Sequence, residues 1–171
     1  ITCLLQSGMF EIRTIEDADE LATAFAHCAE NHDKAYIVLY ELMINAIEHG
    51  NLNIGYEEKN TLLQNNTLQD EIKKRAAHIT NKNKFVKVTY SKFDNKIEIL
   101  IEDNGNGFDW KKYLSYDPIR LTDLNGRGIA SSKLLQPDIE YLGCGNKVRC
   151  SFLTRVGLTQ KGRVLYKSCY V

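Results

Sequence analysis

The feature that most constrains this chain is a strip of polar residues on an otherwise apolar helix, within the segment 33–50. At about 100° per residue, four polar side chains fall within roughly one third of the helical circumference. They are Glu41, Asn45, Glu48 and His49, and most of the remaining surface carries Ile37, Tyr40, Met43, Ile44 and Ile47. This pattern predicts a mostly buried helix. A carboxylate and a carboxamide buried one turn apart are costly unless a ligand occupies them, and hydrated Mg²⁺ with phosphate oxygens uses both.

Signals at either end of this segment predict where the helix begins and stops. Asp33 follows a polar break and is suited to cap the first turn, and Gly50 is suited to end the last one. A strand at Met9–Thr14 and a helix at Ile15–Cys28 are expected before it, because apolar residues recur there at strand and then helical spacing.

Two pairs of alternating segments predict antiparallel hairpins in the second half of the chain. Phe85–Phe93 and Ile97–Ile101 are separated by Asp94-Asn95, and Asp138–Leu142 and Lys147–Leu153 by the turn 143–146. The first pair should bury Val86, Val88, Tyr90, Ile97, Ile99 and Ile101. Strands bunched in this way, rather than alternating with helices, predict an α/β (α+β) two-layer sandwich in which helices pack on one face of a mixed, mainly antiparallel sheet.

Two glycine-containing segments lie at positions where a ligand can approach the backbone. Asp103-Asn104-Gly105-Asn106-Gly107 directly follows the strand pattern Lys96–Glu102. The stretch Asn125–Ile129 precedes an expected helix through Leu135, so its amides and the helix N-terminus are suited to bind an anion. We expect phosphates to contact Gly126, Arg127, Gly128 and Ile129, although an arginine in a loop is as often merely solvated.

In order and spacing, these segments resemble the nucleotide-binding boxes of the GHKL ATPase superfamily. The resemblance is carried by Glu-x-x-x-Asn at 41–45, Asp-x-Gly-x-Gly at 103–107 and Gly-x-Gly at 126–128, and it runs from about Phe10 to Phe152. Within that superfamily the chain is most similar to the anti-sigma-factor serine/threonine kinases. The resemblance implies a Bergerat ATP-binding fold, a histidine kinase-like ATPase domain over 1–156 and a mobile ATP lid over Lys111–Asn125.

The resemblance also implies roles for single residues. Asp103 would accept a hydrogen bond from the exocyclic amine of adenine, with Gly105 and Gly107 against the base. Asn45 would offer its carbonyl oxygen to Mg²⁺, and Glu41 would orient or deprotonate the attacking hydroxyl near the γ-phosphate of ATP. His49 is a further candidate for nucleotide contact.

Each of these roles has a structural alternative. Asp-Asn-Gly is a common turn between a strand and a helix, and Glu41 could cap or pair with a neighbour. His49 beside Gly50 could simply interact with the helix dipole. Gly145-Asn146 occupies the last hairpin where related branches often carry Gly-Thr, which argues against a water-mediated adenine contact there.

Two parts of the chain depart from the most compact relatives. Residues 55–84 are polar and charged, and they hint at one or two surface helices that form an insertion. A similar insertion occurs in the branch whose kinase domains are attached to receiver or phosphatase domains. The tail 157–171 has no assignable structure. The chain starts at Ile1, not methionine, which fits a fragment of a longer protein.

Length, charge and cysteine content limit the classes of partner that we expect for this protein. The 171 residues suit one domain, and Lys plus Arg balance Asp plus Glu at 22 each, so no global field favours nucleic acid. No apolar run approaches the length that spans a bilayer. The five cysteines are scattered without metal or redox spacing, and we expect reduced thiols in a cytoplasmic protein.

Three functions fit these observations. The first is an ATP- and Mg²⁺-dependent serine/threonine protein kinase that phosphorylates a small antagonist protein in a partner-switching circuit, with a sigma factor or an attached receiver or phosphatase domain as further partners. The resemblance also allows a homodimer. The second is an ATP-dependent binding module that sequesters a regulator without turnover. The third is the catalytic half of a histidine kinase, which the lack of a phosphorylatable histidine helix ahead of the domain disfavours.

Overall fold

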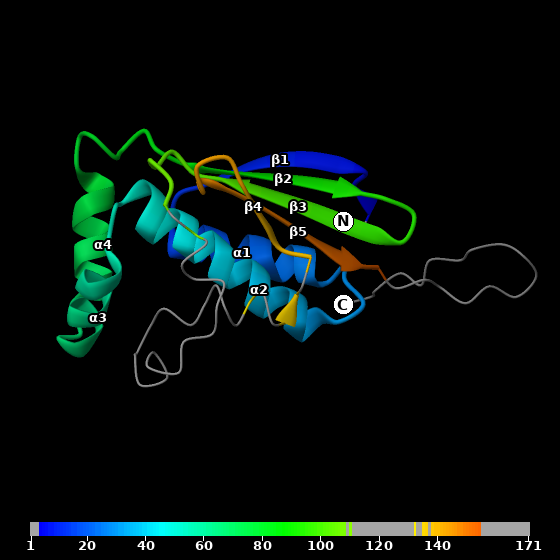
Figure 1. Ribbon diagram of the computed structural model, residues 1–171, viewed down its shortest axis with the longest axis horizontal. Helices are drawn as coiled ribbons and strands as arrows, with labels where there is room; N and C mark the ends of the chain where they lie inside the picture. The colour runs from blue at the N-terminus through cyan, green and yellow to red at the C-terminus, as the bar shows by residue number, and fades with distance from the viewer. Residues whose placement is uncertain (1–3, 109, 111–131, 133–134, 137, 155–171) are drawn as a thin grey trace, which may run out of the picture.

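The computed structural model describes residues 4–108, 110, 132, 135–136 and 138–154, and Figure 1 shows their arrangement. The elements in chain order are β1 (Ser7–Ile12), α1 (Ile15–Ala26), α2 (His32–Asn45), the π-helical turn η2 (Ala46–Asn51), α3 (Tyr56–Gln64), α4 (Leu68–Ala77), β2 (Val86–Lys92), β3 (Lys96–Glu102), β4 (Glu140–Leu142) and β5 (Lys147–Leu153).

The five described strands form one sheet in the order β1-β2-β3-β5-β4. Both expected hairpins are confirmed: β2 pairs with β3 so that Val88 faces Ile101, and β4 pairs with β5. All four pairings are antiparallel. The mainly antiparallel sheet is therefore confirmed, and no parallel pair that would make it mixed occurs among the described strands.

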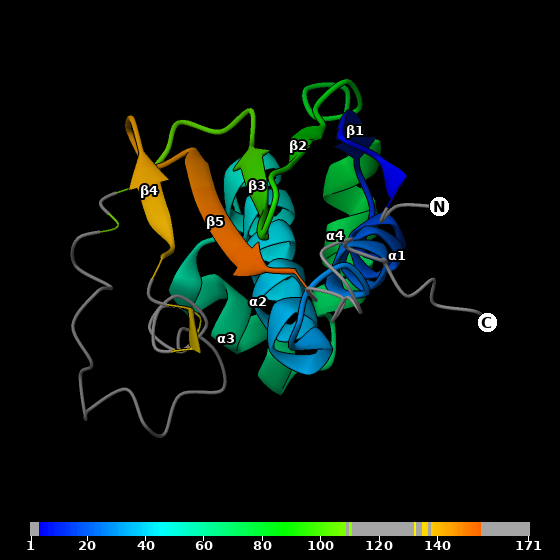
Figure 2. The same ribbon diagram turned by 90° about the vertical axis from the view of Figure 1, so that its right-hand side faces the viewer.

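Helices α1 and α2 pack on one face of this sheet, which gives the α+β architecture expected from the sequence (Figures 1 and 2). All six residues expected on the buried face of β2 and β3 are at most 1% exposed. Phe25 of α1 joins the two layers, because its ring stacks on Tyr90 at 5.0 Å and meets Phe10 edge-on at 5.4 Å. Burial of such aromatic and branched side chains supplies most of the stability of a small domain.

The helix that carries the polar strip differs at both ends from the expectation. Its cap is Asn31, whose side chain accepts from the Lys34 N–H at 3.0 Å, while Asp33 lies inside the first turn. Gly50 does not end the helix either, because α2 continues as η2 to Asn51. Ile37 is 52% exposed, so the helix is less buried around its circumference than the apolar pattern suggested.

Residues 55–84 contain two short helices, α3 and α4, as expected. No residue of α3 is buried, and α4 buries Leu68 and Ile72. This pair stands at one end of the molecule, beside the end of η2 (Figure 1). Segments 111–131 and 157–171, with the expected lid and tail, lie outside the described residues.

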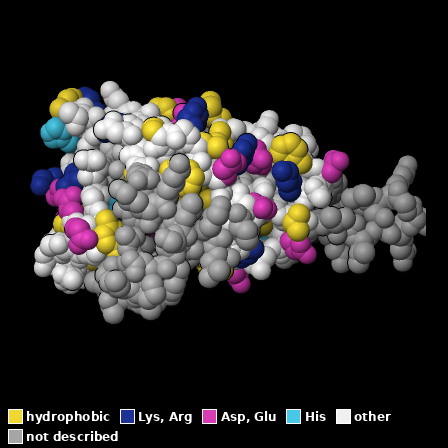
Figure 3. Space-filling model, in the orientation of Figure 1, with side chains coloured by type: hydrophobic (Ala, Val, Ile, Leu, Met, Phe, Trp, Pro, Cys, Tyr) yellow, Lys and Arg dark blue, Asp and Glu magenta, His cyan; other side chains and the backbone are white. Residues whose placement is uncertain are grey.

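The described surface is mixed in charge. On the face in Figure 3, acidic and basic side chains alternate over the coloured part, without a continuous basic area. No described helix has both the length and the apolar character needed to cross a bilayer.

Candidate functional site

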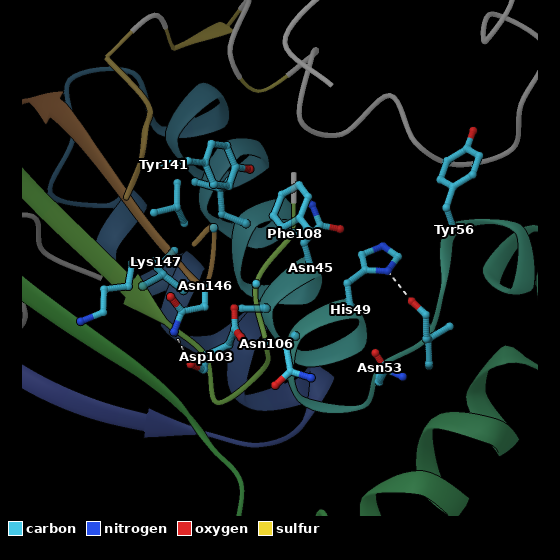
Figure 4. A pocket seen from close by; sticks show the side chains of 18 of the residues that line it. Asn45, His49, Asn53, Tyr56, Asp103, Asn106, Phe108, Tyr141, Asn146 and Lys147 are labelled. Carbon is cyan, nitrogen blue, oxygen red and sulfur yellow. Dashed lines mark hydrogen bonds between the residues drawn. The ribbon is translucent and has the colours of Figure 1, made fainter. Parts of the chain in front are cut away.

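A cavity of about 540 Å³ opens where α2 and η2 meet the ends of β3 and the β4–β5 hairpin. Five of the six described residues that sequence analysis assigned to the site line this cavity: Glu41, Asn45, His49, Asp103 and Gly107. The sixth, Gly105, donates its N–H to Asp103 Oδ1 at 2.7 Å. Figure 4 shows Asn45, His49 and Asp103 around one space. The other four assigned residues, 126–129, lie outside the described residues.

Asp103 lies in a cradle made by two glycines. A Cβ on Gly50 would lie 2.3 Å from Asp103 Cγ, and a Cβ on Gly105 would lie 2.4 Å from the Gly50 carbonyl oxygen. Only residues without a side chain allow such contacts, so η2 and the 103–107 loop approach each other through backbone. Gly50 therefore makes room for the carboxylate, a role that sequence analysis missed because the contact spans residues 50 and 103.

The Asp103 carboxylate is held by few donors. Oδ1 accepts from the Gly105 N–H at 2.7 Å, which is the only hydrogen bond that another described residue gives to this carboxylate. Burial raises the pKa of Asp103 to about 6, and the neighbouring Glu102 charge adds to the rise. A partly buried carboxylate with spare acceptor capacity is suited to receive a donor from a ligand.

The main chain of Asp103 is fixed from the other side by Asn146 in the β4–β5 turn. The Asp103 N–H donates to the Asn146 carbonyl at 3.0 Å, and Asn146 Nδ2 donates to the Asp103 carbonyl at 3.3 Å. Gly107 lets the loop pass close to this turn: it has a φ of 76°, and a Cβ there would lie 2.3 Å from the Cys144 carbonyl oxygen. Gly145 and Asn146 both line the cavity, although sequence analysis expected no water-mediated adenine contact at this turn.

Glu41 and Asn45 form a hydrogen-bonded pair one helical turn apart. Asn45 Nδ2 donates to Glu41 Oε1 at 3.1 Å. Because a carboxylate only accepts, the amide must present its NH₂ group to Glu41, which leaves the Asn45 carbonyl oxygen available to a ligand. This oxygen is of the hard type that Mg²⁺ prefers. No group of three or more His, Cys, Asp or Glu within the described residues could hold a metal without help from a ligand.

His49 lies in η2, and one of its two ring nitrogens already has a hydrogen-bond partner. Its Nδ1 contacts the Ile54 carbonyl at 2.5 Å, and since a carbonyl only accepts, Nδ1 carries the proton. Burial lowers the pKa of His49, so the ring is neutral and Nε2 is an acceptor. His49 thus lines the cavity as a neutral group rather than as a cation.

Side-chain hydrogen bonds stabilise the π-helical turn and the residues that follow it. One is the contact of His49 with the Ile54 carbonyl, and the others come from the segment 55–84. Lys84 Nζ donates to the Asn51 carbonyl at 2.8 Å, and Arg75 Nη1 donates to the carbonyls of Leu52 and Asn53 at 3.2 and 2.9 Å. Carbonyls at the end of a helix have no intrahelical donor and need such partners. A π-turn in this position rotates His49 and Gly50 relative to a regular α-helix, and π-turns are frequent at functional sites.

An aromatic cluster, absent from the sequence prediction, forms part of the wall. Tyr141 of β4 stacks on Trp110 with centroids 5.7 Å apart and meets Phe108 edge-on at 5.6 Å. Burial raises the pKa of Tyr141, and the charge of Glu41 adds to that rise. Alternation along 138–142 could have marked Tyr141 as inward-facing, but no local pattern connects it with Glu41.

Comparison with known proteins adds no family assignment. The chain matches no protein-family model, and no curated protein matches it significantly.

Proposed function

We propose that this domain binds Mg²⁺·ATP in a Bergerat-type site of the GHKL kind and transfers the γ-phosphoryl group to a serine or threonine of a partner protein. The observation that carries the proposal is the cavity that brings the cradled carboxylate of Asp103 together with the Glu41–Asn45 pair. These groups come from a helix and a loop more than fifty positions apart in the chain, and each offers an oxygen that this reaction needs.

The adenine base is assigned to the Asp103 end of the cavity. The ionised carboxyl group accepts the exocyclic amine of adenine, whereas guanine presents a carbonyl oxygen there and is repelled. Gly107, Phe108 and Tyr141 line the cavity, and the two aromatic side chains supply apolar wall against which a flat ring can pack. We therefore expect preference for ATP over GTP.

The phosphates and the metal are assigned to the Asn45 side. The carbonyl oxygen of Asn45 would be the protein ligand of Mg²⁺, which keeps several waters and takes other oxygens from phosphate. When bound, Mg²⁺ neutralises charge on the phosphates. The Gly126–Ile129 segment remains our candidate for further phosphate contacts.

Glu41 acts on the acceptor hydroxyl. Its Oε1 accepts from Asn45, which holds the carboxylate in place, and its second oxygen is left to accept the proton of the incoming hydroxyl. The hydroxyl oxygen forms a bond to the γ-phosphorus, the bond from that phosphorus to the bridging oxygen of ADP breaks, and the hydroxyl proton passes to Glu41.

The nature of the phosphorylated product tests the function. Incubation with γ-labelled Mg²⁺·ATP and candidate small antagonist proteins is expected to give acid-stable label on one of them, because phosphoserine and phosphothreonine esters survive acid. Label on this chain itself should be minor. An acid-labile product would instead support the histidine-kinase function, and tight ATP binding with no transfer to a full set of candidates would support the binding module.

Binding of Mg²⁺·ATP is expected to weaken as the pH falls through about 6, because Asp103 has a pKa of about 6 and only its ionised form is a pure acceptor. One unit below that pKa, about a tenth of these carboxyls remain ionised, so affinity at pH 5 should be about tenfold lower than at pH 7. Calorimetric titration of the wild type and of Asp103→Asn, which cannot titrate at this position, measures the effect. Protonation of ATP itself contributes equally to both proteins. Equal pH dependence in the two would contradict the role of Asp103.

A further inference from the structure

A second part of the cavity wall comes from the segment 55–84, outside the three boxes. Gly55, Tyr56, Lys59 and Leu63 line the cavity at the beginning of α3. Figure 4 shows Tyr56 on the far side of His49 from Asp103. This part of the wall therefore borders the end of the cavity away from the proposed adenine position.

Lys59 supplies a cation at this end. Its Nζ lies 2.5 Å from Glu48 Oε2, and the two side chains are only 13% and 4% exposed. Glu48 Oε2 has no well-directed hydrogen bond in the described part of the protein, so charge attraction compensates its burial. A lysine ammonium has three donors, and Glu48 is the only ion-pair partner of Lys59 among the described residues. Lys59 can therefore bind an anion while it remains paired with Glu48.

The other described lysine at the cavity is directed elsewhere. Lys147 lines the wall at the Asp103 end, but its ammonium pairs with Glu102 at 2.8 Å. In Figure 4 the Lys147 side chain extends away from Asn45 and His49. His49 itself is neutral, because burial lowers its pKa and the charge of Lys59 lowers it further. Among the described residues, the positive charge at this end of the cavity is therefore that of Lys59.

A ligand with several negative charges suits the Lys59 ammonium. A polyphosphate would accept charge-assisted hydrogen bonds from it. The start of α3 itself adds no attraction, because its first turn carries Glu57 and Glu58, and Glu58 accepts from the Gly55 N–H at 3.2 Å.

We infer that Lys59 binds the terminal phosphates of the nucleotide, so that the segment 55–84 completes the site and makes it selective for ATP over nucleotides without β- and γ-phosphates. This inference rests on the proposed function. The segment then has two roles. Arg75 and Lys84 donate to the carbonyls at the end of the π-turn, and α3 places Lys59 at the cavity, where it can bind phosphate.

The test compares binding of Mg²⁺·ATP and AMP by calorimetry in three proteins. Lys59→Met alone would leave Glu48 buried without a partner and could unfold the chain, so the main variant is Glu48→Gln/Lys59→Met, which removes both charges. Glu48→Gln alone is the matched control, because it keeps the cation. Loss of a charge-assisted hydrogen bond predicts roughly tenfold to a hundredfold weaker ATP binding in the double variant. AMP binding should change by less than about threefold, since its single phosphate is not the one contacted.

Two outcomes would overturn the inference. One is an unchanged affinity for both ATP and AMP in the folded double variant. The other is an equal loss of both nucleotides, which would mean that the pair only supports the shape of the site. Retention of the wild-type ratio in Glu48→Gln, with its loss in the double variant, supports it. Failure of the wild-type protein to bind either nucleotide would contradict the proposed function itself and is distinct from these results.

Discussion

Glu41→Gln is expected to lower phosphoryl transfer by about a hundredfold or more, the usual contribution of a positioned base. The affinity for Mg²⁺·ATP should stay within about tenfold of the wild type. Glutamine keeps the size of the side chain, and its carbonyl oxygen can still accept from Asn45 Nδ2 as Glu41 Oε1 does at 3.1 Å. It cannot take up the hydroxyl proton. Calorimetry gives the affinity, and the initial rate of acid-stable labelling of the partner gives the transfer.

Asn45→Ala is the matched comparison on the same face of the helix. It removes the proposed metal ligand, so loss of Mg²⁺-dependent nucleotide binding is expected instead of a loss confined to transfer. If Glu41→Gln transferred phosphate at the wild-type rate, the carboxylate would have only the structural role of holding Asn45.

Gly50→Ala is expected to weaken Mg²⁺·ATP binding by up to about a hundredfold and to lower the free energy of unfolding by about 1–3 kcal/mol. The added Cβ would lie 2.3 Å from Asp103 Cγ and 2.5 Å from Oδ1. To reach an ordinary contact distance of ~3.5 Å the carboxylate must move by about 1 Å, which misaligns its charge-assisted hydrogen bond to the base. Thermal melting with and without Mg²⁺·ATP, together with calorimetry, measures both effects.

Gly55→Ala is the control for stability in this experiment. A Cβ at Gly55 would meet nothing within 4 Å, and the backbone φ of −69° suits alanine. Its free energy of unfolding should differ from the wild type by less than about 1 kcal/mol. Unaltered ATP affinity in Gly50→Ala would mean that the Asp103 carboxylate does not contact the base.

The antiparallel hairpins could be predicted from the sequence because their determinants are local. Alternation with period two states which side chains share a face, and a short turn then pairs the two strands. The six residues expected inside β2 and β3 are buried for this reason. The Glu41–Asn45 pair was predictable in the same way, since residues four apart on a helix are neighbours wherever that helix packs.

The ends of the central helix were less predictable, because tertiary contacts decide them. Asp33 and Asn31 are both acceptable caps by residue type, and the observed choice depends on where the chain leaves the preceding loop. Glycine commonly ends a helix, yet the chain continues past Gly50 as a π-turn. Arg75 and Lys84 donate to the carbonyls that follow, those of residues 51–53, and so stabilise this extension.

The sequence by itself determined the secondary structure of the sheet, its buried face and the polar groups at 41–49 and 103–107, because these follow from spacings of a few residues. Only the tertiary structure decided that Gly50 admits the Asp103 carboxylate, that Tyr141 shares a wall with Glu41, and that Lys59 reaches the same cavity. Each of these contacts joins residues that are far apart along the chain. The packing of whole helices and strands sets the distances between these residues. The periodicity of the sequence reflects only neighbours a few positions apart and cannot predict such distances.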